Sequence, residues 1–115
     1  MQTCYVYSGE LLCTSCGNAE KEIIRAAYPE RVDSEFSDHW PQEETISESD
    51  TPDHCAGCGC FLQNPLTPDG DSYVRELAKA YDAPDSSWEE IAARAESAGN
   101  HTVAEWCRYY FAPGQ

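Results

Sequence analysis

Four of the cysteines stand in two Cys-x-x-Cys pairs, each followed by glycine: Cys13-Thr14-Ser15-Cys16-Gly17 and Cys55-Ala56-Gly57-Cys58-Gly59. Thiolates three residues apart can reach a single ion at Zn–S distances of about 2.3 Å. Two such pairs supply the four ligands of a structural zinc site, which leaves no coordination position open for a substrate. The spacing predicts one structural Zn²⁺ per chain, bound by Cys13, Cys16, Cys55 and Cys58.

Residues next to the pairs bear on how the site is built. A glycine after each pair permits a positive φ, which would turn main-chain N–H groups toward the sulfur atoms. Cys60 and His54 stand beside the second pair, so either could replace a ligand, although the expected role of His54 is a hydrogen bond to the site. Cys4, Cys60 and Cys107 are expected to be free cysteines that pack as small apolar residues.

Seven cysteines in 115 residues would also suit a disulfide-rich secreted domain. That class needs a signal peptide, whereas residues 1–7 have neither a basic start nor an apolar run. A thioredoxin-like redox pair would be single and would lie in a βαβ pattern, which is absent from the sequence. The pattern favours reduced, zinc-bound cysteines and a cytoplasmic location.

The chain is strongly acidic: 21 Asp and Glu against 7 Lys and Arg give a formal net charge of −14. A field of this sign repels nucleic acid and acidic membrane surfaces. No apolar run approaches the length that spans a membrane. We therefore expect neither direct nucleic-acid binding nor membrane binding.

Much of this charge falls between the two cysteine pairs. Residues 30–53 hold nine acidic residues and one basic residue, Arg31, for a net charge of −8. Such a segment predicts an acidic loop, which is either simply solvated or forms a partner-binding surface. In the second hypothesis Phe36 and Trp40 are the apolar anchors, of which Trp40 is the main one. The charged residues would be Glu35, Asp38, Glu43, Glu44, Glu48 and Asp50.

The remaining pattern predicts an α+β fold in a single domain, residues 1–115. Strand-forming residues at 3–7 and 10–12 flank a Ser8-Gly9 turn. Helical spacing indicates one early helix, from an Asn18 N-cap to Pro29, and two or three helices after Gly70. Capping-box spacing marks the starts of the later helices at Ser86 with Glu89 and at Thr102 with Glu105. The prediction is a zinc-stapled β-knuckle platform that carries these helices.

Catalytic constellations are missing from the sequence. The three histidines, His39, His54 and His101, are scattered, and there is no His-Glu-x-x-His motif, phosphate-binding glycine loop or serine elbow. We expect a non-enzymatic protein.

With both cysteine pairs placed, the chain resembles a family of small uncharacterised phage and actinobacterial zinc-knuckle (zinc-ribbon-like) proteins. The resemblance covers most of the chain outside the acidic segment. It rests on Tyr5-Val6-Tyr7, Leu12-Cys13-x-x-Cys16, His54-Cys55-x-x-Cys58-Gly59, Phe61-Leu62, Asn64-Pro65-Leu66-Thr67, Asp69-Gly70, Tyr73-Val74-Arg75, Glu105-Trp106 and Tyr109-Tyr110. It implies a mobile-element origin and zinc at the same four cysteines, and it implies no activity.

Two hypotheses of function follow. In the first, the chain acts in the host cytoplasm, as a monomer or small homo-oligomer, and inhibits a basic nucleic-acid-handling host protein. A defence nuclease or CRISPR effector would be the target, with carboxylates taking the place of phosphates as in an anti-CRISPR mimic. In the second, the chain is a structural adaptor that uses its aromatic C-terminal helix. Trp106, Tyr109, Tyr110 and Phe111 are more rings than one buried stripe absorbs.

Overall fold

The computed structural model describes residues 3–112, and its contacts divide the chain into two compact units. Unit 1 takes in the chain up to Glu48 together with Asp53–Pro65, and unit 2 takes in Ser49–Pro52 and the chain from Leu66 onward. The sequence had suggested a single domain. The segment Ser49–Pro52 belongs to unit 2 because Ser49 pairs with Leu66 at the entry to the next helix.

The α+β prediction is confirmed. The described residues combine a three-stranded antiparallel sheet with one early helix and three later helices, and the third strand comes after the early helix in the chain. The elements of unit 1 are β1 (Thr3–Tyr7), β2 (Glu10–Leu12), α1 (Thr14–Ala27), the 3-10 turn η1 (Pro29–Arg31) and β3 (Gln42–Thr45). The expected Ser8-Gly9 turn joins β1 to β2, and both of its residues have positive φ.

Strand β3 lies inside the segment that the sequence predicts to be an acidic loop. It pairs with β1, with Cys4 opposite Glu44 and Tyr5 opposite Glu43, and completes the strand order β2-β1-β3. The β3 sequence is Gln42-Glu43-Glu44-Thr45, and glutamate has low strand propensity. A strand was therefore not expected here. The loop prediction is wrong here because backbone pairing to β1, rather than burial of side chains, holds β3 in place.

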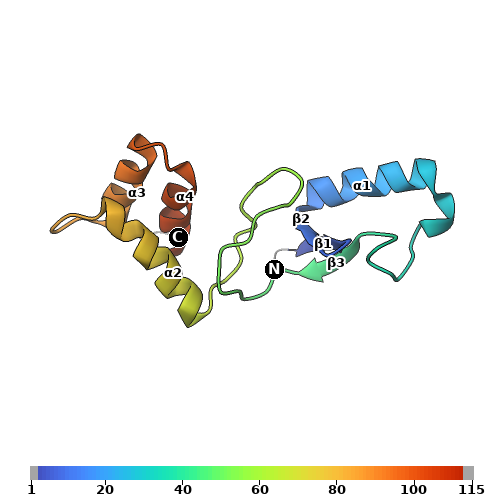
Figure 1. The fold of residues 1–115 in the computed structure, drawn as a ribbon, viewed down its shortest axis with the longest axis horizontal. Helices are drawn as coiled ribbons and strands as arrows, with labels where there is room; N and C mark the ends of the chain where they lie inside the picture. The colour runs from blue at the N-terminus through green and yellow to red at the C-terminus, as the bar shows by residue number, and fades with distance from the viewer. Residues whose placement is uncertain (1–2, 113–115) are drawn as a thin grey trace. The chain divides into compact units, whose positions relative to one another are not determined.

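Helix α1 packs against β1, as Figure 1 shows. The contact lies on the face of β1 that carries Tyr5. Gly17 makes this approach possible, since a Cβ at that position would lie 2.1 Å from Cδ2 of Tyr5. The Tyr5 hydroxyl donates to Asn18 Oδ1, and Lys21 Nζ donates to the Tyr5 oxygen. The predicted start of this helix is wrong: the N-cap is Cys13, and Asn18 lies one turn inside the helix.

Trp40 belongs to the core of unit 1 rather than to an exposed surface. Only 6% of the residue is exposed, and the cationic groups of Lys21 and Arg25 lie over its ring at 5.6 and 5.7 Å from the centroid. The prediction of Trp40 as an exposed anchor is therefore wrong. The large apolar ring of Trp40 lies under the Lys21 and Arg25 side chains and so covers the second half of α1.

Unit 2 consists of α2 (Pro68–Ala78), the 3-10 turn η2 (Lys79–Tyr81), α3 (Trp88–Ser97) and α4 (His101–Tyr110). Helices α3 and α4 pack on each other and on α2, and the same three helices group together in Figure 1. Their buried face is made largely of small residues: Val74, Ala78, Ile91, Ala92, Ala95, Val103, Ala104, Trp106 and Cys107. Small side chains let the short helices approach closely, so unit 2 has a tight core.

Each helix of unit 2 begins at a side-chain cap. Thr67 Oγ1 accepts from the amide of Gly70, and Asn100 Oδ1 accepts from the amide of Val103. In α3, Ser87 and Glu90 form a complete capping box. The caps predicted at Ser86 and Thr102 are thus wrong, by one and two residues.

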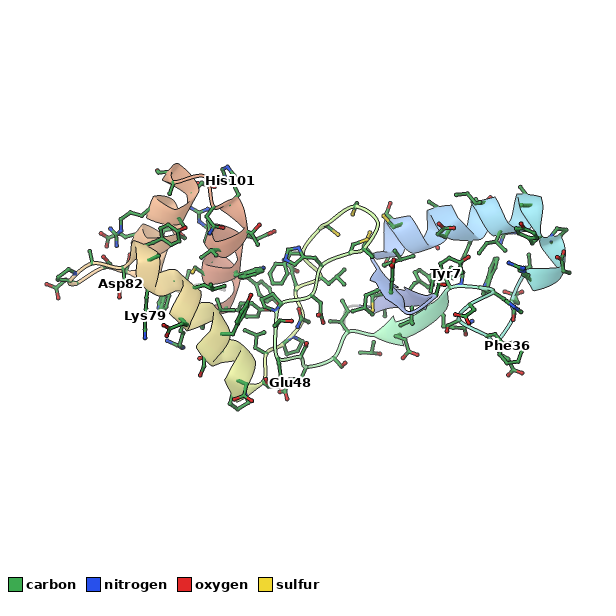
Figure 2. The ribbon with its side chains drawn as sticks, viewed as in Figure 1. Tyr7, Phe36, Glu48, Lys79, Asp82 and His101 are labelled. Atoms are coloured by element: carbon green, nitrogen blue, oxygen red, sulfur yellow. The ribbon has the colours of Figure 1, made fainter. Side chains whose placement is uncertain are left out.

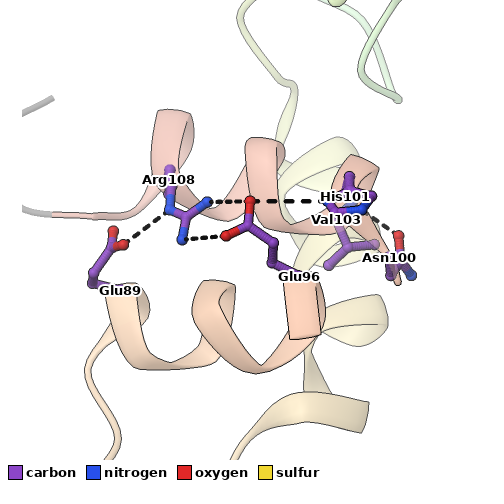
Figure 3. Close-up of polar contacts among 6 residues, drawn as sticks. All are labelled: Glu89, Glu96, Asn100, His101, Val103 and Arg108. Carbon is purple, nitrogen blue, oxygen red and sulfur yellow. Dashed lines mark hydrogen bonds and ion pairs between the residues drawn. The ribbon is translucent and has the colours of Figure 1, made fainter. Parts of the chain in front are cut away.

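An ion-pair network joins α3 to α4 (Figure 3). The guanidinium of Arg108 reaches Glu89 Oε1 at 2.9 Å and Glu96 Oε2 at 3.2 Å. Imidazole Nδ1 of His101 lies 3.9 Å from Glu96 as well. In the described part of the chain, no helix is long and apolar enough to cross a membrane.

Candidate functional site: a four-cysteine metal centre

The fold brings together the four cysteines that the sequence singles out. The sulfur atoms of Cys13, Cys16, Cys55 and Cys58 all lie within 4.8 Å of one another. The two pairs lie 42 residues apart in the sequence, yet Cys13 Sγ and Cys58 Sγ are separated by only 3.8 Å. The four cysteines form a group that could hold a metal ion, at the junction of β2, α1 and the 55–60 loop.

The first pair is positioned by the start of α1. Strand β2 ends at Leu12, Cys13 is the N-cap, and Cys16 follows within the first turn of the helix. The amide of Cys16 donates to Cys13 Sγ at 3.4 Å, so this sulfur takes the place of the usual capping oxygen. The positive end of the helix dipole favours negative charge at Cys13, which suits a metal-binding thiolate.

The second pair sits on a tight loop that closes on itself. The amide of Cys55 donates to the Cys60 carbonyl at 2.8 Å, and the amide of Gly59 donates back to the Cys55 carbonyl at 2.8 Å. Within the loop, Cys55 Sγ accepts from the amides of Gly57 at 3.3 Å and Cys58 at 3.5 Å. Both first cysteines thus accept amide hydrogens from their own turn.

One backbone contact fixes the second loop against the first. The amide of Ala56 donates to the carbonyl of Leu11, in β2, at 2.9 Å. On the far side of the loop, His54 pairs with Phe61 as a β-bridge, and their rings stack at 5.5 Å. These contacts hold the second loop beside the end of β2.

The arrangement fits a tetrahedral ion. Four sulfurs at about 2.3 Å from a central ion would lie about 3.8 Å apart, because a tetrahedron's edge is about 1.6 times its radius. The Cys13–Cys58 separation of 3.8 Å has this value. The other sulfur–sulfur distances are at most 4.8 Å, which is within about 1 Å of the tetrahedral value.

Three thiols of the group differ in pKa because their surroundings differ. Burial raises the pKa of Cys55, but hydrogen bonds from backbone amides outweigh it and bring that pKa down to about 6. The pKa of Cys58 is lowered, first by a hydrogen bond from the Cys60 backbone. Hydrogen bonds with the neighbouring sulfurs raise the pKa of Cys16 to about 12. The group therefore holds thiolate at neutral pH, and a cation would displace the protons that remain.

Neighbouring residues have roles that the sequence only partly predicted. Gly59 has φ +80°, as expected, whereas Gly17 is helical and is needed for the close approach to Tyr5. The ring of His54 points its Nδ1 at the Gly59 carbonyl, 2.8 Å away, and so braces the loop. Cys60 is exposed rather than buried. Its thiol is partly desolvated beside the sulfurs of Cys58 and Cys13, which raises the pKa of Cys60 to about 12.

The other two cysteines match expectation. Cys4 and Cys107 are free and buried, at 3% and 0% exposed, and pack as apolar residues. The pKa of Cys107 is raised because of this burial.

The predicted partner-binding acids are all exposed but do not all belong to one unit. Glu35 and Asp38 lie in the turn before Trp40, Glu43 and Glu44 lie on β3, and Glu48 ends this part of unit 1. Asp50 belongs to unit 2, where its carboxylate accepts from the Thr67 hydroxyl at 2.5 Å. The acidic surface of unit 1 is defined here as Glu35, Asp38, Glu43, Glu44 and Glu48.

Of the two aromatic anchors that the sequence predicted, Phe36 is the exposed one, and it lies among these acids. Phe36, labelled in Figure 2, is 64% exposed and meets His39 edge to face at 5.9 Å. The sequence offered both Phe36 and Trp40, and hydrophobicity alone could not tell which one would be buried. Position relative to α1 decides it, because Trp40 reaches the Lys21 and Arg25 side chains.

The C-terminal aromatic residues mostly pack on one another and on their own unit. Trp106 is 8% exposed, and the Phe111 ring lies 4.5 Å from that of Trp88. Tyr109 and Tyr110 are half-buried and meet edge to face at 5.1 Å. Packing within unit 2 thus covers more of these rings than one apolar face of the last helix would cover.

Comparison with known protein families, with characterised proteins and with solved structures finds no match to this chain.

Proposed function

We propose that the chain is a non-enzymatic, zinc-binding protein whose acidic surface on unit 1 binds a basic protein partner. The observation that carries this is the group of exposed carboxylates, around an exposed Phe36, on a unit that the cysteine group can hold rigid. A rigid scaffold matters because it lowers the entropy lost when charged side chains meet a partner.

Zinc is the ion that this donor set suits best. Four thiolates in a tetrahedral array favour Zn²⁺ or iron, and a closed array of this kind in a small domain is typical of structural zinc. Zinc brings no redox chemistry, and four cysteine ligands leave it no open position. Its role here would be to hold β2, α1 and the 55–60 loop together.

The proposed partner is a protein that handles nucleic acid. Such proteins carry grooves lined with Lys and Arg for phosphate contacts, and spaced carboxylates can occupy those grooves with fast, salt-sensitive association. The net charge of −14 supports long-range attraction to such a surface. Within this proposal, a host defence nuclease or a CRISPR effector is the candidate target, because each binds nucleic acid through a basic surface.

The test compares two charge-reversed variants of equal net charge. The first is Glu43→Lys with Glu44→Lys and Glu48→Lys, on unit 1. The second, a matched control, is Asp82→Lys with Asp85→Lys and Glu105→Lys, at exposed positions of unit 2. Calorimetric titration with a decalysine peptide should show a loss of at least about tenfold in affinity for the first variant and less than about threefold for the control.

Capture of partners from a host lysate with the same three proteins extends the test. Basic nucleic-acid-binding proteins should be retained by the unmodified chain and by the control, and lost by the unit 1 variant. If both variants lose decalysine affinity equally, net charge alone attracts the peptide and the proposed surface is refuted.

The adaptor hypothesis remains a second candidate because Tyr73 and Leu77, on α2, are 43% and 38% exposed, and Tyr109 and Tyr110 are half-buried. These residues would offer an apolar contact. Tyr109→Ala should then abolish capture of a partner that the unit 1 reversal leaves bound.

A further inference from the structure

A small pocket opens on the face of the sheet opposite α1. All of its lining residues belong to unit 1, and its volume is about 210 Å³. Pockets for drug-sized ligands and cofactors have volumes of about 300–1,000 Å³, so this one suits a single side chain or a comparably small group. Its apolar walls are Val6, Leu11, Ile46 and Leu62.

The strand register explains how the pocket arises. Side chains alternate along β1, so Tyr5 faces α1 while Cys4 and Val6 face the other way. Residues directly opposite each other share a face, which places Glu44 beside Cys4 and Glu43 beside Tyr5. Two adjacent, exposed glutamates of β3 therefore project from opposite faces, and only Glu44 lines the pocket.

Two carboxylates enter this apolar setting. Glu44 comes from β3, and Asp53 from the segment that leads to the second cysteine pair. The backbone of Asp53 is held on both sides: its amide donates to Asn64 Oδ1 at 2.6 Å, and its carbonyl accepts from the amide of Leu62 at 2.9 Å. Asn64 is itself 0% exposed, so this anchor is rigid.

The negative charges of Glu44 and Asp53 both act on the thiol of Cys4, which lines the pocket. Cys4 is 3% exposed, and its pKa is raised by burial and then by the charges of Glu44 and Asp53. Among the residues that the structure describes, no cationic side chain lines the pocket. Its occupant should therefore bring an aliphatic section for the walls and a positive charge for the two carboxylates.

We propose that this pocket receives a single lysine or arginine side chain of the basic protein partner. Lysine and arginine have this combination of an aliphatic stem and a cationic head, and they bury the stem along apolar surface while the head stays polar. The inference rests on the proposed function, and it gives the acidic surface one specific insertion point. Glu44 would form the charged contact at the rim and Asp53 the one beside the wall.

The experiment uses a peptide with one cation, acetyl-Gly-Gly-Arg-Gly-Gly-amide, titrated into the zinc-loaded, ¹⁵N-labelled chain. The matched peptide contains citrulline, which has nearly the shape of arginine without its charge. We expect the arginine peptide to shift the amide resonances of Val6, Leu11, Ile46 and Leu62. We expect the citrulline peptide to bind about tenfold more weakly, the size of one lost charged hydrogen bond.

Two single substitutions on β3 give the sharpest control. Glu44→Gln removes a pocket charge, and Glu43→Gln removes the neighbouring charge on the other face, with the same change in net charge. Affinity for the arginine peptide should fall about tenfold for Glu44→Gln and less than about twofold for Glu43→Gln. Equal weakening by the two substitutions, or resonance shifts confined to other residues, would overturn the pocket proposal.

Failure of the pocket can be told apart from failure of the proposed function. If decalysine still binds the acidic surface while the arginine peptide leaves the pocket resonances unmoved, the pocket proposal is refuted and the proposed function stands. If the arginine peptide occupies the pocket but charge reversal at Glu43, Glu44 and Glu48 leaves decalysine binding unchanged, the proposed function is refuted and the pocket stands.

Discussion

Units 1 and 2 are stabilised by different means. Unit 1 has a three-stranded sheet of short strands, one helix and long connections, and its buried apolar residues are divided between the two faces of the sheet. Unit 2 has three short helices, each with a side-chain cap, around one buried face. A small sheet with so little regular structure needs a covalent or metal cross-link, whereas capped helices around an apolar core do not.

The positions of the cysteines agree with this difference. The group of four lies entirely in unit 1, while the cysteine of unit 2, Cys107, is a buried core residue. Metal binding should therefore act on one unit and leave the other largely as it is. The three predictions that follow test this separation.

Metal removal should have the largest effect. Zinc binding to such sites contributes on the order of 10–16 kcal/mol, which is comparable to or exceeds the stability of a whole domain. Chelation, or Cys55→Ser, should therefore unfold unit 1, with loss of dispersed amide resonances from β1, β2 and α1. Resonances from α3 and α4 should keep their positions.

Cys60→Ser is the matched control for this prediction, since Cys60 lies beside the group of four but outside it. That variant should retain one equivalent of zinc by elemental analysis. Less than half an equivalent in the unmodified chain would refute the zinc proposal. Simultaneous loss of all helical resonances on chelation would show that the two units depend on each other.

A smaller effect is expected from Gly17→Ala, again confined to unit 1. The added Cβ would lie 2.1 Å from the Tyr5 ring, so α1 must move off β1. Overpacking of this kind costs about 1–3 kcal/mol, and the better helix propensity of alanine offsets no more than about 1 kcal/mol of it. Amide hydrogen exchange should quicken in β1 and α1 and stay unchanged in unit 2.

Ser15→Ala, at an exposed position of the same helix, is the control for Gly17→Ala and should leave exchange within about twofold of the unmodified chain. If Gly17→Ala slows exchange in unit 1, helix propensity outweighs the contact with Tyr5.

The sequence predicted the fold class and the cysteine group well because both depend on local patterns. Cys-x-x-Cys spacing indicates which sulfurs can meet. Helical spacing predicted two or three helices after Gly70, and the structure has three, the first of which begins at Pro68. Strand β3 could not be predicted, because Glu43 and Glu44 are held by backbone pairing to β1 and their side chains carry no strand signal. Long-range pairing of this kind leaves no trace in a local window.

The starts of the helices show a second limit of prediction from the sequence. Cysteine was not considered as a cap, yet Cys13 Sγ accepts the amide of Cys16, and α1 begins five residues earlier than the asparagine signal suggested. At α3 the predicted pair, Ser86 with Glu89, has the same spacing as the real one, Ser87 with Glu90. Two equivalent patterns one residue apart cannot be separated by spacing. The choice depends on which register buries Ile91 and Ala95.

The smallest expected effect is the pH dependence of unit 2, through Glu96. Hydrogen bonds from Arg108, followed by its charge, lower the pKa of Glu96 below the usual value of a glutamate. A carboxyl group whose pKa is lower in the folded state stabilises that state at pH above its unfolded pKa, and this stability is lost as pH falls through the folded pKa. Glu96→Gln should therefore reduce the stability of unit 2 at pH 7, and the difference should disappear as pH falls through the lowered pKa of Glu96.

The measurement is the thermal unfolding of α3 and α4, followed by their resonances at a series of pH values, in the unmodified chain and the variant. Acid also protonates the thiolates of unit 1, but it does so equally in both proteins, so the difference between them isolates Glu96. Glu105→Gln, another exposed carboxylate of α4, should give no such pH-dependent difference. The pairs are exposed, so high salt should weaken the effect of Glu96→Gln. An effect that survives 1 M salt would mean that Glu96 supports the α3–α4 contact by packing rather than by charge.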